Sequence, residues 1–164
     1  MEKWDAYNKD FALIEGVTLT RGCAIPQGMY HLVSDILVRH KDGTYLIMRR
    51  SPNKHYGGLW EATAGGSALK GETPLECAIR ELKEETGIIA KDIKEVGRET
   101  NDETHSFYVE FLCVTDIDKD KITIQEGETD AYKWVSKDEL LILKESELIT
   151  KRMFCYITEL ARKR

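Results

Sequence analysis

The segment that decides the fold spans residues 66–88 and reads GSALKGETPLECAIRELKEETGI. Thr73, Pro74 and Glu76 predict a helix start, because Thr is a favoured N-cap, Pro fits the first helical position and Glu completes a capping box. Gly87 predicts the helix end, since glycine is common just after a helical C-terminus. The sequence therefore predicts one well-bounded helix in the middle of the chain.

This helix carries an apolar stripe and an acidic arc. Successive helical residues lie about 100° apart around the axis, so apolar residues at helical spacing are expected to face the core. The expected stripe consists of Leu75, Ala78, Ile79 and Leu82. The same spacing gathers Glu81, Glu84 and Glu85 within an arc of about 100° on another side. Like charges at such separations destabilise a helix by roughly 0.2–0.5 kcal/mol per pair, so the arc needs an explanation.

Two interpretations of the acidic arc are open from the helix alone. It can be a solvated face, neutralised by Lys83 and by an i,i+4 pair between Arg80 and Glu84. It can also be a metal site, because carboxylate oxygens on one rigid element suit Mg²⁺. Gly65 and Gly66, just before the helix, favour the second interpretation because glycine lets the backbone approach a ligand closely.

The same segment resembles the signature of the Nudix hydrolase family, G-x5-E-x7-R-E-U-x-E-E-x-G-U, in which U is a bulky apolar residue. Every position matches, namely Gly66, Glu72, Arg80, Glu81, Leu82, Glu84, Glu85, Gly87 and Ile88. Residues 66–88 are called the Nudix box below. The segments on either side are also similar, so the resemblance covers roughly residues 28–143.

The resemblance implies an enzyme that uses Mg²⁺, with Mn²⁺ as a substitute. It implies cleavage of a phosphoanhydride bond in a nucleoside diphosphate linked to another group, or in a nucleoside triphosphate. The implied metal ligands are Glu81, Glu84, Glu85 and the carbonyl of Gly66. Glu84 is also an expected catalytic residue. Arg80 and Glu72 are expected to be structural: Arg80 would orient a neighbouring glutamate, and Glu72 would tie the loop to the helix.

A catalytic base outside the box is also implied. The run Gln125-Glu126-Gly127-Glu128 adds two carboxylates on a predicted loop before the strand that contains Trp134. A metal lowers the pKa of a bound water, and a nearby carboxylate can then accept its proton. We favour Glu128 as this base, with Glu126 second; the alternative is that both are solvated loop residues.

The run MRRSPNK, residues 48–54, narrows the resemblance to the branch that includes isopentenyl-diphosphate isomerase. This branch implies that Arg50 and Lys54 bind diphosphate, and it aligns His31 with a metal-binding histidine. The isomerase needs a cysteine just before the box, where this chain has Ala64-Gly65-Gly66. We therefore expect hydrolysis rather than isomerisation, and a non-catalytic nucleotide-binding module is the remaining alternative.

The order of expected elements predicts an α+β fold, a Nudix-like α/β/α sandwich with a mixed sheet. Strands are expected near Val17–Thr20, Met29–Arg39, Thr44–Arg50, Leu59–Ala64, Ile93–Thr100, His105–Val114 and Ala131–Val135. The turn Asp42-Gly43 predicts that the second and third of these form a hairpin. A short helix is expected from Ser136 to about Leu143. We expect one domain over residues 1–164, with a cover segment at 1–28 and a C-terminal helix at 146–164.

Composition narrows the partners and the compartment. With 24 basic and 29 acidic residues the net charge is −5, and no Lys/Arg cluster typical of a nucleic-acid-binding surface is present. The N-terminus is too polar for a signal peptide, and no apolar run approaches the roughly 20 residues that span a bilayer. The widely spaced cysteines, Cys23, Cys77, Cys113 and Cys155, are expected to be free thiols. We expect a cytoplasmic protein with a small-molecule diphosphate substrate, no nucleic acid or membrane partner, and a homodimer as an open alternative.

Overall fold

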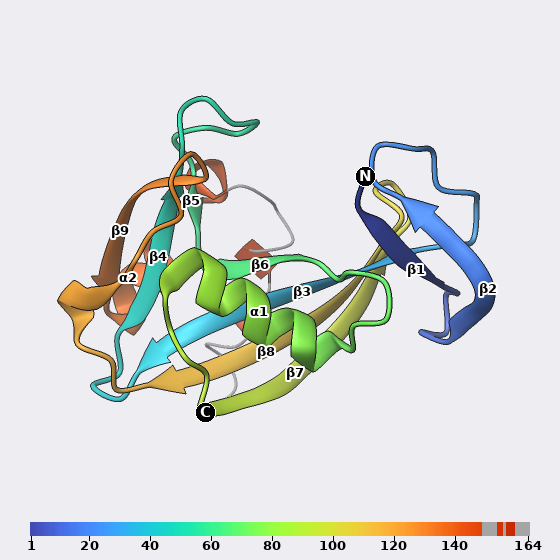
Figure 1. Cartoon of the computed structure of the whole chain (residues 1–164). Coiled ribbons are helices and arrows are strands. Elements are labelled where there is room, and N and C mark those ends of the chain that lie inside the picture. Colours follow the sequence, from blue (N-terminus) through green and yellow to red (C-terminus); the bar gives the residue numbers. More distant parts are fainter. Residues whose placement is uncertain (149–153, 156, 160–164) are drawn as a thin grey trace.

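The structure, a computed structural model, describes residues 1–148, 154–155 and 157–159 (Figure 1). The strands are β1 (Lys3–Tyr7), β2 (Leu13–Thr20), β3 (His31–His40), β4 (Tyr45–Arg50), β5 (Trp60–Glu61), β6 (Thr63–Ser67), β7 (Asp92–Asn101), β8 (Ser106–Thr115) and β9 (Thr129–Val135). Within residues 1–148 the α-helices are α1 (Pro74–Thr86) and α2 (Lys137–Ile142), and the 3-10 turns are η1 (Lys119–Lys121) and η2 (Glu145–Glu147).

The larger sheet is mixed. Its strands follow the order β5-β4-β3-β8-β7, with β6 also paired to β3 and β9 to β4. Strands β3 and β8 run parallel, from His31 opposite Ser106 to His40 opposite Thr115, and the other pairs are antiparallel. A mixed sheet of this kind is what the sequence predicted.

The expected hairpin of β3 and β4 is correct only beside its turn. Arg39 pairs with Tyr45, and beyond this point the two strands separate. The segment of β5 and β6 fills the gap, because β5 pairs with β4 and β6 pairs with β3. Gly65 and Gly66 therefore lie inside β6, whereas the sequence placed them after a strand that ends at Ala64.

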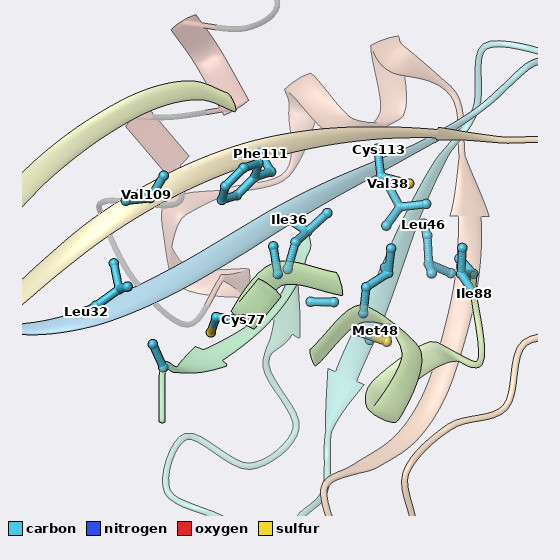
Figure 2. Close-up of a cluster of buried hydrophobic side chains, with 14 of the residues drawn as sticks. Leu32, Ile36, Val38, Leu46, Met48, Cys77, Ile88, Val109, Phe111 and Cys113 are labelled. Carbon is cyan, nitrogen blue, oxygen red and sulfur yellow. The ribbon is translucent and has the colours of Figure 1, made fainter. Parts of the chain in front are cut away.

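Alternating side chains of the central strands face two cores. Ile36 and Val38 of β3 pack with Ala78 and Leu82 of α1, in the cluster shown in Figure 2. Leu37, between them in sequence, packs on the opposite face: its cluster includes Leu140 of α2, Ile157 in the helical residues 157–159, and Leu148. Helices thus cover both faces, and the predicted α/β/α sandwich is confirmed.

The predicted apolar stripe of α1 was wrong at two positions. Leu75 and Ile79 are 44% and 40% exposed. The buried residues are instead Cys77, Ala78, Leu82 and Thr86. The buried face of α1 is therefore rotated about the helix axis relative to the predicted one. At about 100° per residue, Glu81 and Glu85 fall between Cys77 and Leu82, on the side of the helix that meets the sheet. The two carboxylates are thereby directed toward β6, not toward bulk solvent.

The N-terminal segment is a two-stranded sheet. Strand β1 was not predicted, and β2 begins at Leu13 rather than at Val17. The pair has an apolar cluster of its own, Trp4, Ala6 and Leu19. The expected cover segment is therefore a β-hairpin, which lies at one end of the molecule in Figure 1.

The expected C-terminal helix lies partly outside the described residues. Glu145–Glu147 form a 3-10 turn, and Leu148 makes an isolated β-bridge with Trp60, so an α-helical start at residue 146 was wrong. Residues 154–155 and 157–159 are helical. No helix in the described ranges combines the length and the apolar character that crossing a membrane requires.

Candidate active site

A cleft of about 340 Å³ opens beside α1 and β6. Among the described residues, five carboxylates line it: Glu2, Glu81, Glu84, Glu85 and Glu128. Four cations line it as well: Arg21, Arg50, Lys54 and Arg80. Gly66 is part of the same wall. The structure thus brings the predicted site residues together in one cleft, with Glu72 just behind it as a partner of Arg80.

The two glycines of β6 make room for the carboxylates of α1. The backbone N–H of Gly65 donates to Oε2 of Glu85 at 3.0 Å. A Cβ added at Gly66 would lie 2.6 Å from the Glu81 carboxylate, so the carboxylate would have to leave its present position. The Gly66 carbonyl accepts a hydrogen bond from the Cys77 thiol, with 3.5 Å between the heavy atoms. Close packing of strand and helix therefore depends on the absence of side chains here.

Arg80 holds the acidic residues of the box together. Its Nε and one terminal nitrogen donate to both oxygens of Glu72, at 2.6 and 2.8 Å. Its other terminal nitrogen contacts Glu81 at 2.7 Å and Glu84 at 3.3 Å. The bonds from Arg80 keep the pKa of Glu72 below its ordinary value. One guanidinium thus offsets much of the repulsion among these carboxylates.

Glu85 has the most perturbed carboxyl of the cleft. Burial raises its pKa to about 8, against the hydrogen bond from Gly65, and the negative charges of Glu61, Glu81 and Glu128 add to the rise. Burial disfavours the charged form of an acid, and nearby like charges do the same. The Glu85 carboxylate therefore lies where a further positive charge would be stabilising.

Glu61 is a member of this acidic group that the sequence reasoning missed. Burial raises the pKa of its carboxyl, which accepts a 2.7 Å hydrogen bond from Arg50. A lone acid in the apolar run LWEATA, just before two glycines, was the available signal. Acids are rarely enclosed unless they are paired, so an acid within an apolar run indicates a carboxylate with a partner.

The donor chemistry of the cleft fits a divalent cation. No three His, Cys, Asp or Glu side chains in the described part of the chain are gathered closely enough to form a ready ligand set. Instead, Glu81 and Glu84 contact Arg80, and Glu85 contacts Gly65. The oxygens are nevertheless hard donors on one rigid helix, as Mg²⁺ prefers. A bound cation would also stabilise the ionised form of Glu85, which burial and neighbouring carboxylates disfavour.

The wall formed by the end of β4 and the following loop carries the predicted phosphate-binding cations. Arg50 donates to the His55 carbonyl at 2.8 Å in addition to its bond with Glu61. Lys54 forms an ion pair with Glu128. Glu126, the second candidate base, is exposed and is not among the lining residues. Of the two loop glutamates, Glu128 is thus the one placed in the cleft.

No aromatic side chain is among the described residues that line the cleft. Phe107 is buried in the core, while Tyr56 is 51% exposed. The ring of Trp60 lies 4.4 Å from the Lys133 ammonium. His31 stacks on Trp4, and burial lowers the pKa of its imidazole to about 4. These residues have packing or surface contacts, and the cleft itself is polar.

Outside the Nudix box, three of the described lining residues were given no role from the sequence: Glu2, Arg21 and Gln125. Glu2 and Arg21 belong to the ends of the β1–β2 hairpin, whose place beside the box depends on contacts between distant segments. Gln125 lies in the loop whose glutamates were considered. Only for Gln125 did the sequence offer a signal, because it is a polar neighbour of Glu128.

Comparison with known proteins identifies the family. The NUDIX domain model matches residues 29–156. The chain belongs to the NUDIX family. A Nudix hydrolase of Listeria monocytogenes, of uncharacterised activity, is 32% identical over 89% of this chain and 86% of its own length. An RNA pyrophosphohydrolase of Erythrobacter litoralis is 30% identical over 68% of this chain and 79% of its own.

Solved structures agree on the Nudix fold. The crystal structure of DR0079 from Deinococcus radiodurans superposes with a TM-score of 0.77 at 20% identity, over 99% of this chain and 98% of that one. The predicted α+β Nudix fold and the predicted enzyme class, a Nudix-type hydrolase acting on acid anhydrides, are confirmed. The family match begins at Met29, so the β1–β2 hairpin lies outside it.

Proposed function

We propose that this Nudix hydrolase depends on Mg²⁺ and cleaves a phosphoanhydride bond in a nucleoside diphosphate linked to another group, or in a nucleoside triphosphate. The observation that carries the proposal is the joining of two kinds of side chain in one cleft. Glu81, Glu84 and Glu85 line it together with Arg50 and Lys54. Carboxylates suit the metal, and the cations suit the phosphates that the metal also binds.

Each side chain has a defined task in this proposal. Glu81, Glu84, Glu85 and the Gly66 carbonyl would hold the cation, which would neutralise phosphate charge and lower the pKa of a bound water. Arg50 and Lys54 donate hydrogen bonds to phosphate oxygens and orient the diphosphate.

Proton transfer is assigned to the carboxylates at the edge of the cleft. Glu128 accepts the proton of the attacking water, because it lines the cleft beside Lys54 and would lie close to phosphates that Lys54 binds. Glu84, whose side chain is 51% exposed at the cleft, is the second carboxylate able to exchange a proton with solvent. The water attacks one phosphorus, and the leaving phosphate departs with the bond electrons.

A substrate panel tests the proposal. In the presence of Mg²⁺, the full chain is incubated in separate reactions with nucleoside triphosphates, nucleoside diphosphate sugars and dinucleotides. The phosphate-containing products are then separated and measured. We expect turnover that disappears with a chelator and returns with Mg²⁺ or Mn²⁺. Tight binding without turnover of any compound would contradict it and favour a non-catalytic module.

A matched pair of variants tests the base. Glu128→Gln should lower kcat by about a hundredfold, the usual range for a general base, while Glu126→Gln, two residues away in the chain but outside the cleft lining, should leave kcat unchanged. Equal effects of the two substitutions would remove Glu128 from the proposed role. The homodimer and the cytoplasmic location stay predictions.

A further inference from the structure

The β1–β2 hairpin is fastened to the loop of the Nudix box. The backbone N–H of Gly71 donates to the Asp5 carboxylate at 2.6 Å, and the N–H of Lys70 donates to the Lys3 carbonyl at 2.8 Å. The Trp4 ring stacks on His31 of β3, with ring centroids 4.3 Å apart. The hairpin therefore holds a defined position beside the cleft, although it lies outside the family match.

This hairpin brings one more cation to the cleft. Arg21 follows the end of β2, and its guanidinium contacts the Glu2 carboxylate at 3.0 Å. The indole N–H of Trp4 donates to the other oxygen of Glu2 at 2.6 Å. In Figure 1 the hairpin lies on one side of α1 and β6, and β4, which leads to Lys54, lies on the other. The cleft thus has cations on two separate walls.

Arg21 is the least engaged of the cleft cations among the described residues. Arg80 contacts three carboxylates, and Arg50 contacts Glu61 and a backbone carbonyl. Lys54 is paired with Glu128. Arg21 makes a single ion pair, through one nitrogen, and its side chain is 67% exposed. A guanidinium has five N–H donors, so most of those of Arg21 can turn to a ligand.

The lining also limits what the cleft can receive. Among its described lining residues no side chain is aromatic, and Leu69 is the one large apolar residue. Bases are usually bound by stacking on aromatic rings, whereas phosphates are bound by charged and hydrogen-bonding groups. The cleft is therefore suited to a phosphate chain, with a base or sugar extending beyond it.

We propose that Arg21 is a substrate-binding residue that pairs with an anionic group beyond the scissile diphosphate, so that compounds with a third phosphate are the preferred substrates. This inference rests on the proposed function, since it assumes that Arg50 and Lys54 bind the diphosphate on the opposite wall. It narrows the proposed substrates to compounds that carry a third phosphate. A nucleoside diphosphate linked to a neutral sugar has no further anionic group with which Arg21 could pair.

The test measures binding, so that it does not depend on turnover. Inorganic tripolyphosphate and pyrophosphate are titrated, each with Mg²⁺, into the wild-type chain and into Arg21→Ala, Arg21→Lys and Lys9→Ala. Lys9 is a matched control: it is an exposed cation of the same hairpin region, 3.9 Å from Asp102 and outside the cleft lining. The melting temperature of each variant shows whether its fold is kept.

We expect Arg21→Ala to weaken tripolyphosphate binding about tenfold, the loss typical of one charge-assisted contact, and pyrophosphate binding less than about twofold. Arg21→Lys should retain most of the affinity, and Lys9→Ala all of it. Equal weakening for both ions, or none, would overturn the inference. The substrate panel tests the proposed function separately. If no compound of the panel is turned over but Arg21→Ala selectively weakens tripolyphosphate binding, the proposed hydrolysis is contradicted and the binding role of Arg21 is retained.

Discussion

At the scale of single residues, the site depends on two positions that have no side chain. Gly65 and Gly66 lie in β6, against β3 and α1. Their neighbours differ in kind: an added Cβ at Gly65 would lie 2.2 Å from the Ser34 carbonyl oxygen, and one at Gly66 would meet the end of the Glu81 side chain. Backbone cannot move aside cheaply, whereas a carboxylate can rotate away.

This difference predicts separable effects of two alanine substitutions. Gly65→Ala should lower the free energy of unfolding by about 1–3 kcal/mol, as overpacking does. Gly66→Ala should cost less stability but lower kcat/KM about tenfold to a hundredfold, because it displaces Glu81. Urea denaturation and steady-state kinetics measure the two effects. A stability loss confined to Gly66→Ala would contradict the assigned contacts.

His31 predicts a pH dependence of stability. In the folded protein, burial and the charge of Arg21 lower the pKa of the His31 imidazole to about 4. In the unfolded chain, where these influences are absent, the pKa is 6.5. Between these values the unfolded chain binds more protons, so stability falls as pH decreases from 6.5 toward 4 and is fully present above 6.5.

The variant His31→Gln removes this titration. When the pH is lowered from 7 to 4.5, the free energy of unfolding of the variant should fall by about 2 kcal/mol less than that of the wild type. The full pKa shift would give a larger difference, but the imidazole is partly solvated. Urea denaturation at the two pH values measures it. Parallel losses in the two proteins would show that His31 carries no linked proton.

At the scale of elements, features that depend on neighbouring residues were predicted correctly, and features that depend on contacts between distant segments were not. The bounds of α1 follow from Thr73, Pro74, Glu76 and Gly87, and the structure has the capping box and the left-handed Gly87 that these residues predict. The face that α1 buries could not be read in the same way. It is decided by the fit of α1 on β3 and β6, which is why Leu75 and Ile79 were misplaced.

The splitting of β3 from β4 has the same origin. A turn signal fixes only the pairs next to the turn, here Arg39 with Tyr45. The insertion of β5 and β6 depends on pairings between segments far apart along the chain. Likewise, the box predicted the acids of the cleft, but no local pattern placed Glu2 and Arg21 there, because the position of the β1–β2 hairpin is a tertiary property.

Thiol labelling tests how the elements pack. Cys77 of α1 and Cys113 of β8 are buried, and burial raises the pKa of each thiol to about 11, while Cys23 and Cys155 are exposed. Because the thiolate is the reactive form, a thiol reagent should label two cysteines rapidly at pH 7.5 and the other two only after unfolding. Mass spectrometry identifies the sites. Rapid labelling of Cys77 in the folded protein would mean that α1 does not bury this face.

At the scale of the whole molecule, the fold concentrates opposite charges in one cleft of a chain whose net charge is −5. The strands bring cations to two walls, and α1 brings acids between them. Burial, and to a lesser extent the charges of Glu61, Glu81 and Glu128, raise the pKa of Glu85 to about 8, so its ionised form is disfavoured in this cleft. A divalent cation and a phosphate chain would together complete this balance of charge.

Metal binding should therefore stabilise the folded protein. Mg²⁺ added at about 100 times its dissociation constant should stabilise the wild type by about 2.7 kcal/mol through mass action. A double variant, Glu81→Gln with Glu85→Gln, should show little gain. Thermal melts with Mg²⁺ and with a chelator measure both, and an equal gain in both proteins would place the cation elsewhere.

The most direct test of the central claim is the Mg²⁺-dependent kcat/KM of wild type and Glu85→Gln on the best substrate of the panel. Glutamine keeps the oxygen that accepts the hydrogen bond from Gly65 and removes the charge. We predict a fall of about a hundredfold, the upper range for weakening a metal site. Turnover equal to that of wild type at every Mg²⁺ concentration would contradict the account.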